Sequence, residues 1–167
     1  MSSSERFSTL VWLIPDQRNR PLFQSIIDRL AEQYDGPGFE PHLTLGKISD
    51  WSEDKKIEGG PIELEATGIF ISPVFTKTLF VRFALSAALQ SMRSSLGMNA
   101  EGYDPHLSLL YCDLPVTEQQ RLAATVSLPP GKVRFDRLSV FRCPDPTKTK
   151  ADVGAWERVS SMELKGA

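Results

Sequence analysis

The chain contains only two histidines, and both stand in the same local sequence. They occur in Pro41-His42-Leu43-Thr44-Leu45 and in Pro105-His106-Leu107-Ser108-Leu109. Because side chains alternate along a strand, His42 and Thr44 are expected on one face, with the two leucines on the other. The second copy repeats this arrangement. Each copy therefore offers an imidazole beside a hydroxyl, above an apolar floor.

Two such pairs, facing each other across a cleft, suit the hydrolysis of a phosphodiester. A neutral imidazole can remove a proton from water while an imidazolium protonates the leaving oxygen, and the hydroxyls of Thr44 and Ser108 can bind the non-bridging oxygens. Histidine fits both tasks because its pKa lies near operating pH. Either imidazole can be the base on steric grounds, and we favour His106 as the base and His42 as the acid.

Other uses of these histidines are less well supported by the sequence. A metal site needs a third ligand, and there is no His-x-x-x-His pair. A serine hydrolase is disfavoured because Gly-x-Ser-x-Gly is absent and Ser108 lies on the strand of its nearest histidine. Cys112 and Cys143 lie outside any Cys-x-x-Cys pair and are expected to be reduced structural cysteines. We therefore expect no metal and no cofactor.

The composition and the net charge limit the classes of partner that the chain is expected to bind. The 167 residues include 19 Lys and Arg against 21 Asp and Glu, which gives a net charge of −2 and a pI near 5.7. The chain thus lacks the positive field with which polynucleotide binders contact phosphates. Residues 1–6 are polar and the apolar run that follows stops at Pro15, short of a signal peptide or membrane span. We expect a cytoplasmic monomer with a small-molecule substrate, without a long nucleic acid or a membrane as partner.

The elements that must position the histidines show both strand and helix patterns. β-Branched and apolar runs predict strands over residues 7–14, 42–48, 62–71, 78–85, 106–111, 132–141 and 156–164. Helical spacing of apolar residues predicts helices over 20–34, 86–96 and 117–126, with Thr117 as an N-cap and Gly97 at a helix end. Residues 144–153 are predicted to form a polar loop. The pattern predicts one α+β domain over residues 1–167.

A weak internal repeat underlies this order. In each half a helix is followed by a glycine-containing loop and then by a strand that carries Pro-His-Leu-[Thr/Ser]-Leu. This indicates two halves of one domain related by a pseudo-twofold axis. The two histidines are then expected on facing inner strands.

Three aromatic residues could belong to the site or to the core. Tyr111 could hydrogen-bond near a phosphate, although strict alternation places it opposite His106 unless the strand ends or bulges near Leu110. Trp12 and Trp156 could line the pocket and stack on a base. We favour a core position for Trp12 and leave Trp156 open.

Three charged residues are also candidates. Arg82 and Lys47 are strand-borne cations that could meet a pyrophosphate, but we favour a solvated face for both. Asp104 could orient the imidazole of His106, or could serve as a turn residue ahead of Pro105.

Four segments resemble the 2H phosphoesterases, named for two His-x-[Ser/Thr]-x motifs, and most of all their plant and yeast cyclic phosphodiesterase branch. They are residues 11–16, 36–45, 105–111 and 156–159, which together span nearly the whole chain. The resemblance implies a bilobal α+β fold, with two antiparallel sheets around a central cleft and helices outside. It also implies metal-independent chemistry, with His42 and His106 as catalytic residues and Thr44, Ser108, Tyr111 and Trp156 as substrate-binding residues.

The same resemblance implies 2′,3′-cyclic nucleotides or ADP-ribose 1″,2″-cyclic phosphate as substrates. Hydrolysis of such a cyclic phosphodiester to a phosphomonoester is the function we favour. One alternative is a 2′,3′-cyclic phosphodiesterase that acts on RNA ends, against which the acidic pI argues. Another is a non-catalytic nucleotide-binding module, against which the two intact motifs argue.

Overall fold

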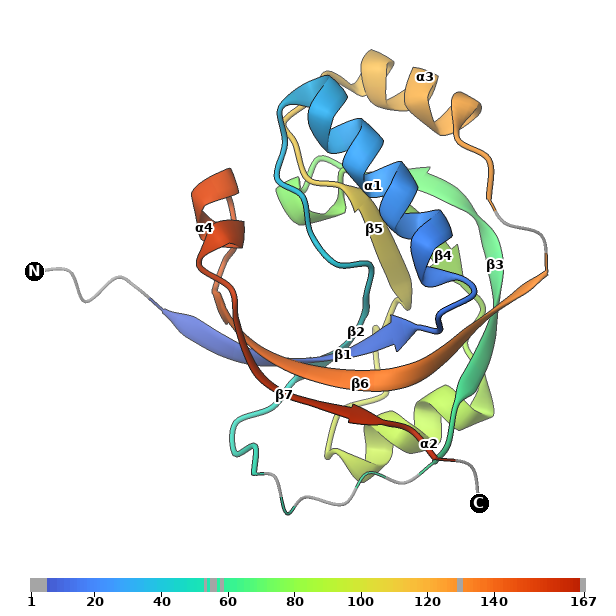
Figure 1. The fold of residues 1–167 in the computed structure, drawn as a ribbon, viewed down its shortest axis with the longest axis vertical. Coiled ribbons are helices and arrows are strands. Elements are labelled where there is room, and N and C mark those ends of the chain that lie inside the picture. Colours follow the sequence, from blue (N-terminus) through green and yellow to red (C-terminus); the bar gives the residue numbers. More distant parts are fainter. Residues whose placement is uncertain (1–5, 53, 55–56, 58, 129–130, 166–167) are drawn as a thin grey trace, which may run out of the picture.

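Figure 1 shows a curved sheet with helices gathered at its two ends, in a computed structural model that describes residues 6–52, 54, 57, 59–128 and 131–165. The strands are β1 (Phe7–Pro15), β2 (Leu43–Lys47), β3 (Ile62–Ile71), β4 (Leu79–Phe83), β5 (His106–Leu110), β6 (Lys132–Pro144) and β7 (Glu157–Glu163). The helices are α1 (Arg20–Tyr34), α2 (Ala87–Ser95), α3 (Val116–Thr125) and α4 (Lys150–Gly154), with a 3-10 turn η1 (Phe75–Lys77). All of the predicted strands and all three predicted helices are present, and their ends differ from the predicted ends by a few residues.

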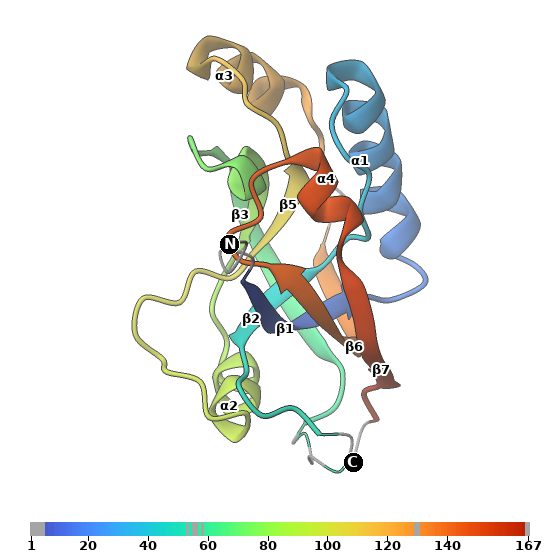
Figure 2. The same ribbon diagram turned by 90° about the vertical axis from the view of Figure 1, so that its left-hand side faces the viewer.

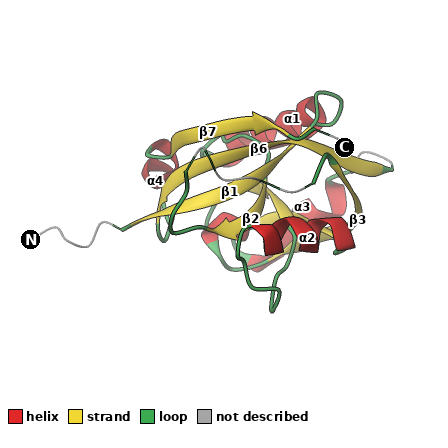
Figure 3. Cartoon of the chain, turned by 90° about the horizontal axis from the view of Figure 1, so that it is seen from below, coloured by secondary structure: helices red, strands yellow, loops and turns green. Residues whose placement is uncertain are grey.

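The strands form a ring. Their order is β1-β2-β5-β4-β3-β6-β7, every neighbouring pair is antiparallel, and β1 also pairs with β6. The β1–β6 pairing closes six strands into a ring and leaves β7 outside it. Figure 3 shows β7, β6 and β1 side by side. The α+β class is confirmed, and the strands of the two halves are hydrogen-bonded to each other at two seams, β2–β5 and β3–β6.

The internal repeat is visible in this topology. Exchanging β1-α1-β2 with β4-α2-β5, and β6 with β3, leaves the order of the ring unchanged. The helices cross between the halves: α1 packs against β5, and Nε of Arg93 on α2 donates to the carbonyl of Leu45 on β2 at 2.8 Å. Figure 2 shows α1 and α3 at one end of the molecule and α2 at the other.

Each of the three longer helices buries part of its apolar face, although Leu22 of α1, which the helical spacing placed on the apolar stripe, is 48% exposed. Phe23, Ile27 and Leu30 of α1 are buried in one core cluster with Leu43 and Leu107, the residues that follow the two histidines. The apolar floor expected beneath each histidine is therefore part of the main core. None of the helices in the described ranges is long and apolar enough to cross a membrane.

Two local predictions were wrong. Residues 150–154 of the expected polar loop form α4, whose first turn is closed by a capping box between Thr149 and Asp152. The Thr-x-x-Asp spacing is the sequence signature of such a start. Thr117 is not an N-cap, because α3 begins at Val116 and its N-cap is Pro115, which makes no side-chain hydrogen bond.

Both cysteines are free, in agreement with the sequence. Burial raises the pKa of the Cys143 thiol to about 12 and also raises that of Cys112. Neutral thiols are poor nucleophiles, which fits structural cysteines.

The loop between α1 and β2 offers a matched test of packing. A Cβ on Gly36 would lie 2.9 Å from the carbonyl oxygen of Tyr111, whereas a Cβ on Gly38 would meet nothing nearer than 4.0 Å. We expect Gly36→Ala to lower the free energy of unfolding by about 1–3 kcal/mol through overpacking against backbone. Gly38→Ala should change it by less than about 0.5 kcal/mol. Urea denaturation measures both, and equal effects of the two variants would contradict the packing described.

Candidate active site

The β2–β5 seam brings His42 and His106 onto one surface. The one ladder pair described between these strands is Leu43 with Leu107. Antiparallel pairing then places His42 across from Ser108, and Thr44 across from His106, on the face opposite the leucines. The histidines become diagonal neighbours, which in such a pair lie about 7–8 Å apart and can share one phosphate. Both line a single cleft of about 660 Å³.

The backbone holds the two imidazoles in the same way. Nδ1 of His42 lies 2.7 Å from the carbonyl oxygen of Glu40, and Nδ1 of His106 lies 2.8 Å from that of Asp104. Because a carbonyl oxygen can only accept, Nδ1 carries the proton in each ring, and Nε2 of the neutral ring keeps a lone pair. Both histidines therefore keep the same nitrogen, Nε2, for chemistry.

His42 lies in an aromatic surround. Its ring stacks on Trp12 with centroids 3.7 Å apart and planes at 18°, and meets Trp156 edge to face with centroids 5.8 Å apart. The residue is only 6% exposed. Loss of solvent lowers the pKa of His42 to about 4, against the opposing effect of the hydrogen bond to Glu40, and the nearby His106 lowers it further. In the free protein His42 is neutral at pH 7.

More charged residues lie around His106 than around His42. Burial lowers its pKa, the hydrogen bond to the Asp104 carbonyl raises it, and the cations Lys77 and Arg82 lower it. Both cations bind the Asp104 carboxylate, with Nε of Arg82 at 2.7 Å and Nζ of Lys77 at 2.8 Å. These bonds hold the pKa of Asp104 at about 2. The Phe80 ring also meets His106 edge to face, with ring centroids 5.4 Å apart.

The charged candidates have specific partners. Arg82 is bound to Asp104 rather than left on a solvated face, and Lys47 is paired with Asp145, which lines the cleft. Asp104 does contact the imidazole of His106, but through its backbone carbonyl and not through its carboxylate.

The hydroxyls of Thr44 and Ser108 both belong to residues of the cleft wall. The Ser108 hydroxyl donates to the carbonyl oxygen of Thr76 at 2.7 Å, so it must rotate before it can donate to a phosphate. The backbone of Thr44 is fixed through its carbonyl, which accepts from the Tyr103 hydroxyl at 2.9 Å.

Tyr111 lines the cleft because the β4–β5 ladder is irregular. Phe80 pairs with Ser108 but Leu79 pairs with Leu110, so one extra residue stands on β5 between these pairs. A bulge of this kind breaks the strict alternation, and Tyr111 shares the cleft with His106. The Tyr111 ring stacks on Phe39 at 4.0 Å, and burial raises the pKa of its phenol, which therefore stays neutral.

The two tryptophans are parts of the cleft wall as well. Trp156 donates from Nε1 to the Thr147 hydroxyl at 3.2 Å and meets Trp12 edge to face at 5.1 Å. Trp12 is only 1% exposed, as expected of a core residue, yet it also lines the cleft beneath His42. Trp12 is thus both a core residue and part of the cleft wall, whereas the sequence presented these positions as alternatives.

The remaining wall comes from segments that the sequence did not single out. They are the turn around η1 (Val74, Phe75 and Thr76), Asp113, and residues 144–148 ahead of α4. In the sequence, residues 144–148 resemble an ordinary polar loop, and only the capping box that follows them indicates local order. Among the described residues, no three His, Cys, Asp or Glu side chains are grouped so that they could hold a metal ion.

A curated relative covers nearly the whole chain. The cyclic phosphodiesterase of Arabidopsis thaliana is 29% identical over 173 residues, which cover 92% of this chain and 93% of the relative. Over nearly its whole length the chain is similar to this cyclic phosphodiesterase, in keeping with the resemblance of its sequence to the 2H phosphoesterases. No protein-family model matches it. The likeness to a cyclic phosphodiesterase over nearly the full length of both proteins supports a phosphodiesterase.

Solved structures show that the 2H phosphoesterase fold is the fold of this chain. Escherichia coli LigT complexed with phosphate is similar with a TM-score of 0.53 at 13% identity, over 96% of this chain and 98% of that one. LigT complexed with 3′-AMP gives a TM-score of 0.51 at 13% identity, over 97% and 99%. The fold expected from the sequence is thereby confirmed.

The imidazoles of His42, which is buried, and His106, which is half-buried, lead to a prediction for the free protein. We expect both to protonate below the usual pKa of 6.5, His42 near pH 4. The folded protein disfavours the imidazolium, whereas the unfolded chain does not. The free energy of unfolding is therefore highest above pH 6.5 and decreases as the pH falls toward 4.

With two histidines in the chain, titration of the imidazole resonances, assigned with His106→Asn, gives the midpoints. Urea unfolding over the same range gives the stability. A His42 midpoint above 6.5, or stability that rises as the pH falls through this range, would refute the prediction.

Proposed function

We propose that this protein hydrolyses cyclic phosphodiesters to phosphomonoesters by metal-independent acid–base catalysis with His42 and His106. The observation that carries the proposal is the matched pair of imidazoles, each with Nδ1 bound to a backbone carbonyl and both on one cleft. Its support from comparison is the likeness to a cyclic phosphodiesterase over nearly the full chain. ADP-ribose 1″,2″-cyclic phosphate and nucleoside 2′,3′-cyclic phosphates are the proposed substrates.

The reaction balances with water as the only co-reactant. One imidazole takes a proton from water through Nε2 as the new O–P bond forms. The other, as imidazolium, donates its Nε2 proton to the ribose oxygen as the ring O–P bond breaks. The product is a phosphomonoester, and one proton has passed from water to the leaving oxygen. No redox step or carrier group is needed.

We assign the base to His106 and the acid to His42. Burial and the cations Lys77 and Arg82 disfavour a proton on His106, against the opposing charge of the Asp104 carboxylate, and the lowered pKa suits a neutral base. At His42 the stacked face of Trp12 attracts an imidazolium, and a bound phosphodiester anion supplies the countercharge that the free protein lacks. These two contributions oppose the burial that keeps His42 neutral in the free protein.

The other residues of the cleft fit recognition of a phosphate with an attached nucleoside. Thr44 and Ser108 supply hydroxyls to the non-bridging oxygens, and Tyr111 supplies a neutral phenol. Trp156 offers a half-buried ring on which a base can stack. LigT, a protein of the same fold, is seen with 3′-AMP, which supports a nucleotide-type ligand.

We propose a small substrate in preference to an RNA end. The cleft wall includes two acidic residues, Asp113 and Asp145, and the chain carries a net charge of −2. Both features oppose binding of a polyanion that extends beyond the reactive phosphate.

The first test of catalysis is removal of each imidazole. We expect His42→Ala and His106→Ala each to lower kcat by about 10²-fold or more, the usual contribution of a general acid or base. The assay uses ADP-ribose 1″,2″-cyclic phosphate, each 2′,3′-cyclic mononucleotide and a cyclic-phosphate-terminated RNA, with EDTA present throughout. Wild-type turnover should be unaffected by EDTA. Near-wild-type turnover in both folded variants would instead favour a binding module.

The second test separates acid from base. A p-nitrophenyl nucleotide diester has a leaving group that departs without protonation. It should therefore restore much of the activity of His42→Ala and little of that of His106→Ala. Restoration of His106→Ala alone would reverse the assignment.

A further inference from the structure

We propose that Glu40 and Asp104 are positioning residues: each, clamped by an arginine, holds the backbone carbonyl that orients the histidine two residues later. The inference rests on the proposed function, because it concerns the orientation of the two imidazoles that the reaction uses. Each clamp is a chain of three groups, which are an arginine, an acidic residue and a histidine.

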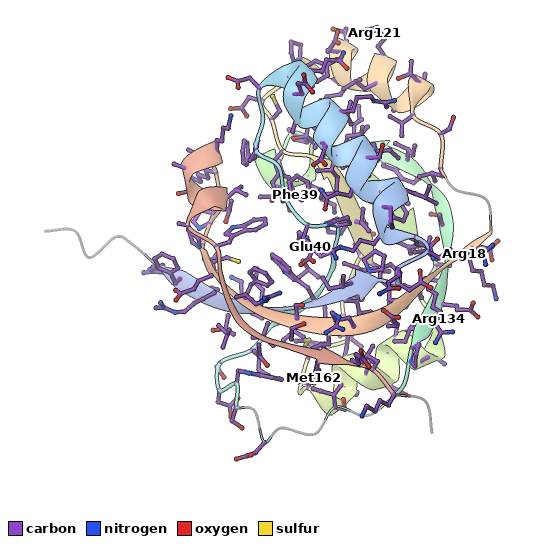
Figure 4. All side chains as sticks on the ribbon, in the orientation of Figure 1. Arg18, Phe39, Glu40, Arg121, Arg134 and Met162 are labelled. Carbon is purple, nitrogen blue, oxygen red and sulfur yellow. The ribbon has the colours of Figure 1, made fainter. Side chains whose placement is uncertain are left out.

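In the first half the chain runs through Glu40. The guanidinium of Arg20, the first residue of α1, lies 2.7 Å from the Glu40 carboxylate. The carbonyl of the same Glu40 accepts from Nδ1 of His42 at 2.7 Å. Figure 4 shows Glu40 in the middle of the molecule, between α1 and the strands β1 and β6.

In the second half the chain runs through Asp104, and the clamp is stronger. Arg82 donates twice, from Nε to Oδ1 at 2.7 Å and from a terminal nitrogen to Oδ2 at 3.0 Å. Lys77 adds a third bond to Oδ2 at 2.8 Å. A bidentate contact fixes the direction of a carboxylate as well as its position. The carbonyl of Asp104 then accepts from Nδ1 of His106 at 2.8 Å.

The two clamps arise from positions that the internal repeat does not relate. On β4, Arg82 stands opposite His106 in the ladder, and the register of β1 with β2 puts Ile14 in the corresponding place opposite His42. The first clamp uses Arg20 from a helix instead. If the clamps had arisen by duplication of one half alone, the arginine would occupy the equivalent position in both halves. The same contact built twice from different elements is expected if each histidine needs its carbonyl held.

The local backbone explains why the acidic side chain must do this work. In both motifs a proline, Pro41 or Pro105, stands between the acidic residue and the histidine, and proline has no N–H with which to tie down the intervening peptide group. The ion pair supplies that constraint. Partly exposed ion pairs of this kind contribute little to stability, so the main consequence of losing one is misplacement of the imidazole. A displacement of about 1 Å is enough to cost on the order of 10²-fold in rate.

The experiment compares clamp variants with an ion pair elsewhere. We expect Asp104→Asn, Arg82→Gln and Glu40→Gln each to lower kcat on a 2′,3′-cyclic mononucleotide by about tenfold or more, with KM changed by less than about threefold. Glu163→Gln is the matched control, because Glu163 pairs with Arg137 on β7 and β6, outside the cleft. It should leave both constants unchanged. Thermal unfolding of every variant shows whether it is folded.

A pH titration supplies a readout that loss of structure would not produce. His106 faces Lys77 on η1, Arg82 on β4, Asp104 ahead of β5, and His42 from the other half. Asp104→Asn removes an anion and should move protonation of His106 to lower pH. Arg82→Gln removes a cation and should move it to higher pH. Falls in kcat of both variants with opposite shifts in protonation would support the clamp.

The outcomes also separate this inference from the proposed function. If His106→Ala is inactive while Asp104→Asn and Glu40→Gln turn over like the wild type, the clamp is overturned and the hydrolysis stands. If His106→Ala is fully active, the proposed function fails first. Should Asp104→Asn not fold, Arg82→Gln and Glu40→Gln on other elements decide the question.

Discussion

The pairing of Leu43 with Leu107 across the β2–β5 seam is the contact on which the rest of the site depends. Both leucines are fully buried, and each carries a histidine before it and a hydroxyl residue after it. A slip of one residue in either strand would turn a histidine into the core and a leucine into the cleft. Burial of the leucines therefore sets the register, and the register places the imidazoles. The chemistry is positioned by hydrophobic packing on the other face of the same strands.

The two halves share a backbone plan but differ in what surrounds each imidazole. Trp12 lies flat against His42, whereas Phe80, at the corresponding place on β4, meets His106 edge-on. Among the described residues other than the two histidines, the charged side chains that shift the pKa of either imidazole are Lys77, Arg82 and Asp104, and all three act on His106. A duplicated imidazole on an undifferentiated scaffold would give two groups of equal proton affinity. The unequal surroundings allow one to be neutral while the other carries the proton, as an acid–base pair requires.

Much of the fold and of the site could be predicted from local sequence. The strand and helix patterns are local, and the motif around each histidine already implied its face. Tyr111 could not be placed, because its position depends on a bulge that forms only when β5 pairs with β4. The sequence left the role of Asp104 open, because residue type draws attention to the carboxylate, while the bond to His106 comes from the carbonyl. Closure of the ring joins β1 to β6, and no local pattern in either strand reveals its distant partner.

That closure has a consequence during synthesis. β1 ends at Pro15, whereas β6, which pairs with β1 from one end of β1 to the other, begins only at Lys132 and therefore leaves the ribosome later. At typical elongation rates the two are separated by on the order of ten seconds. β2 can cover one edge of β1 early, but the other edge stays open until β6 emerges, and its apolar residues are free to meet other nascent chains. β6 therefore completes the pairing of β1, and a ribosome that stalls before β6 releases a chain with an unpaired hydrophobic edge.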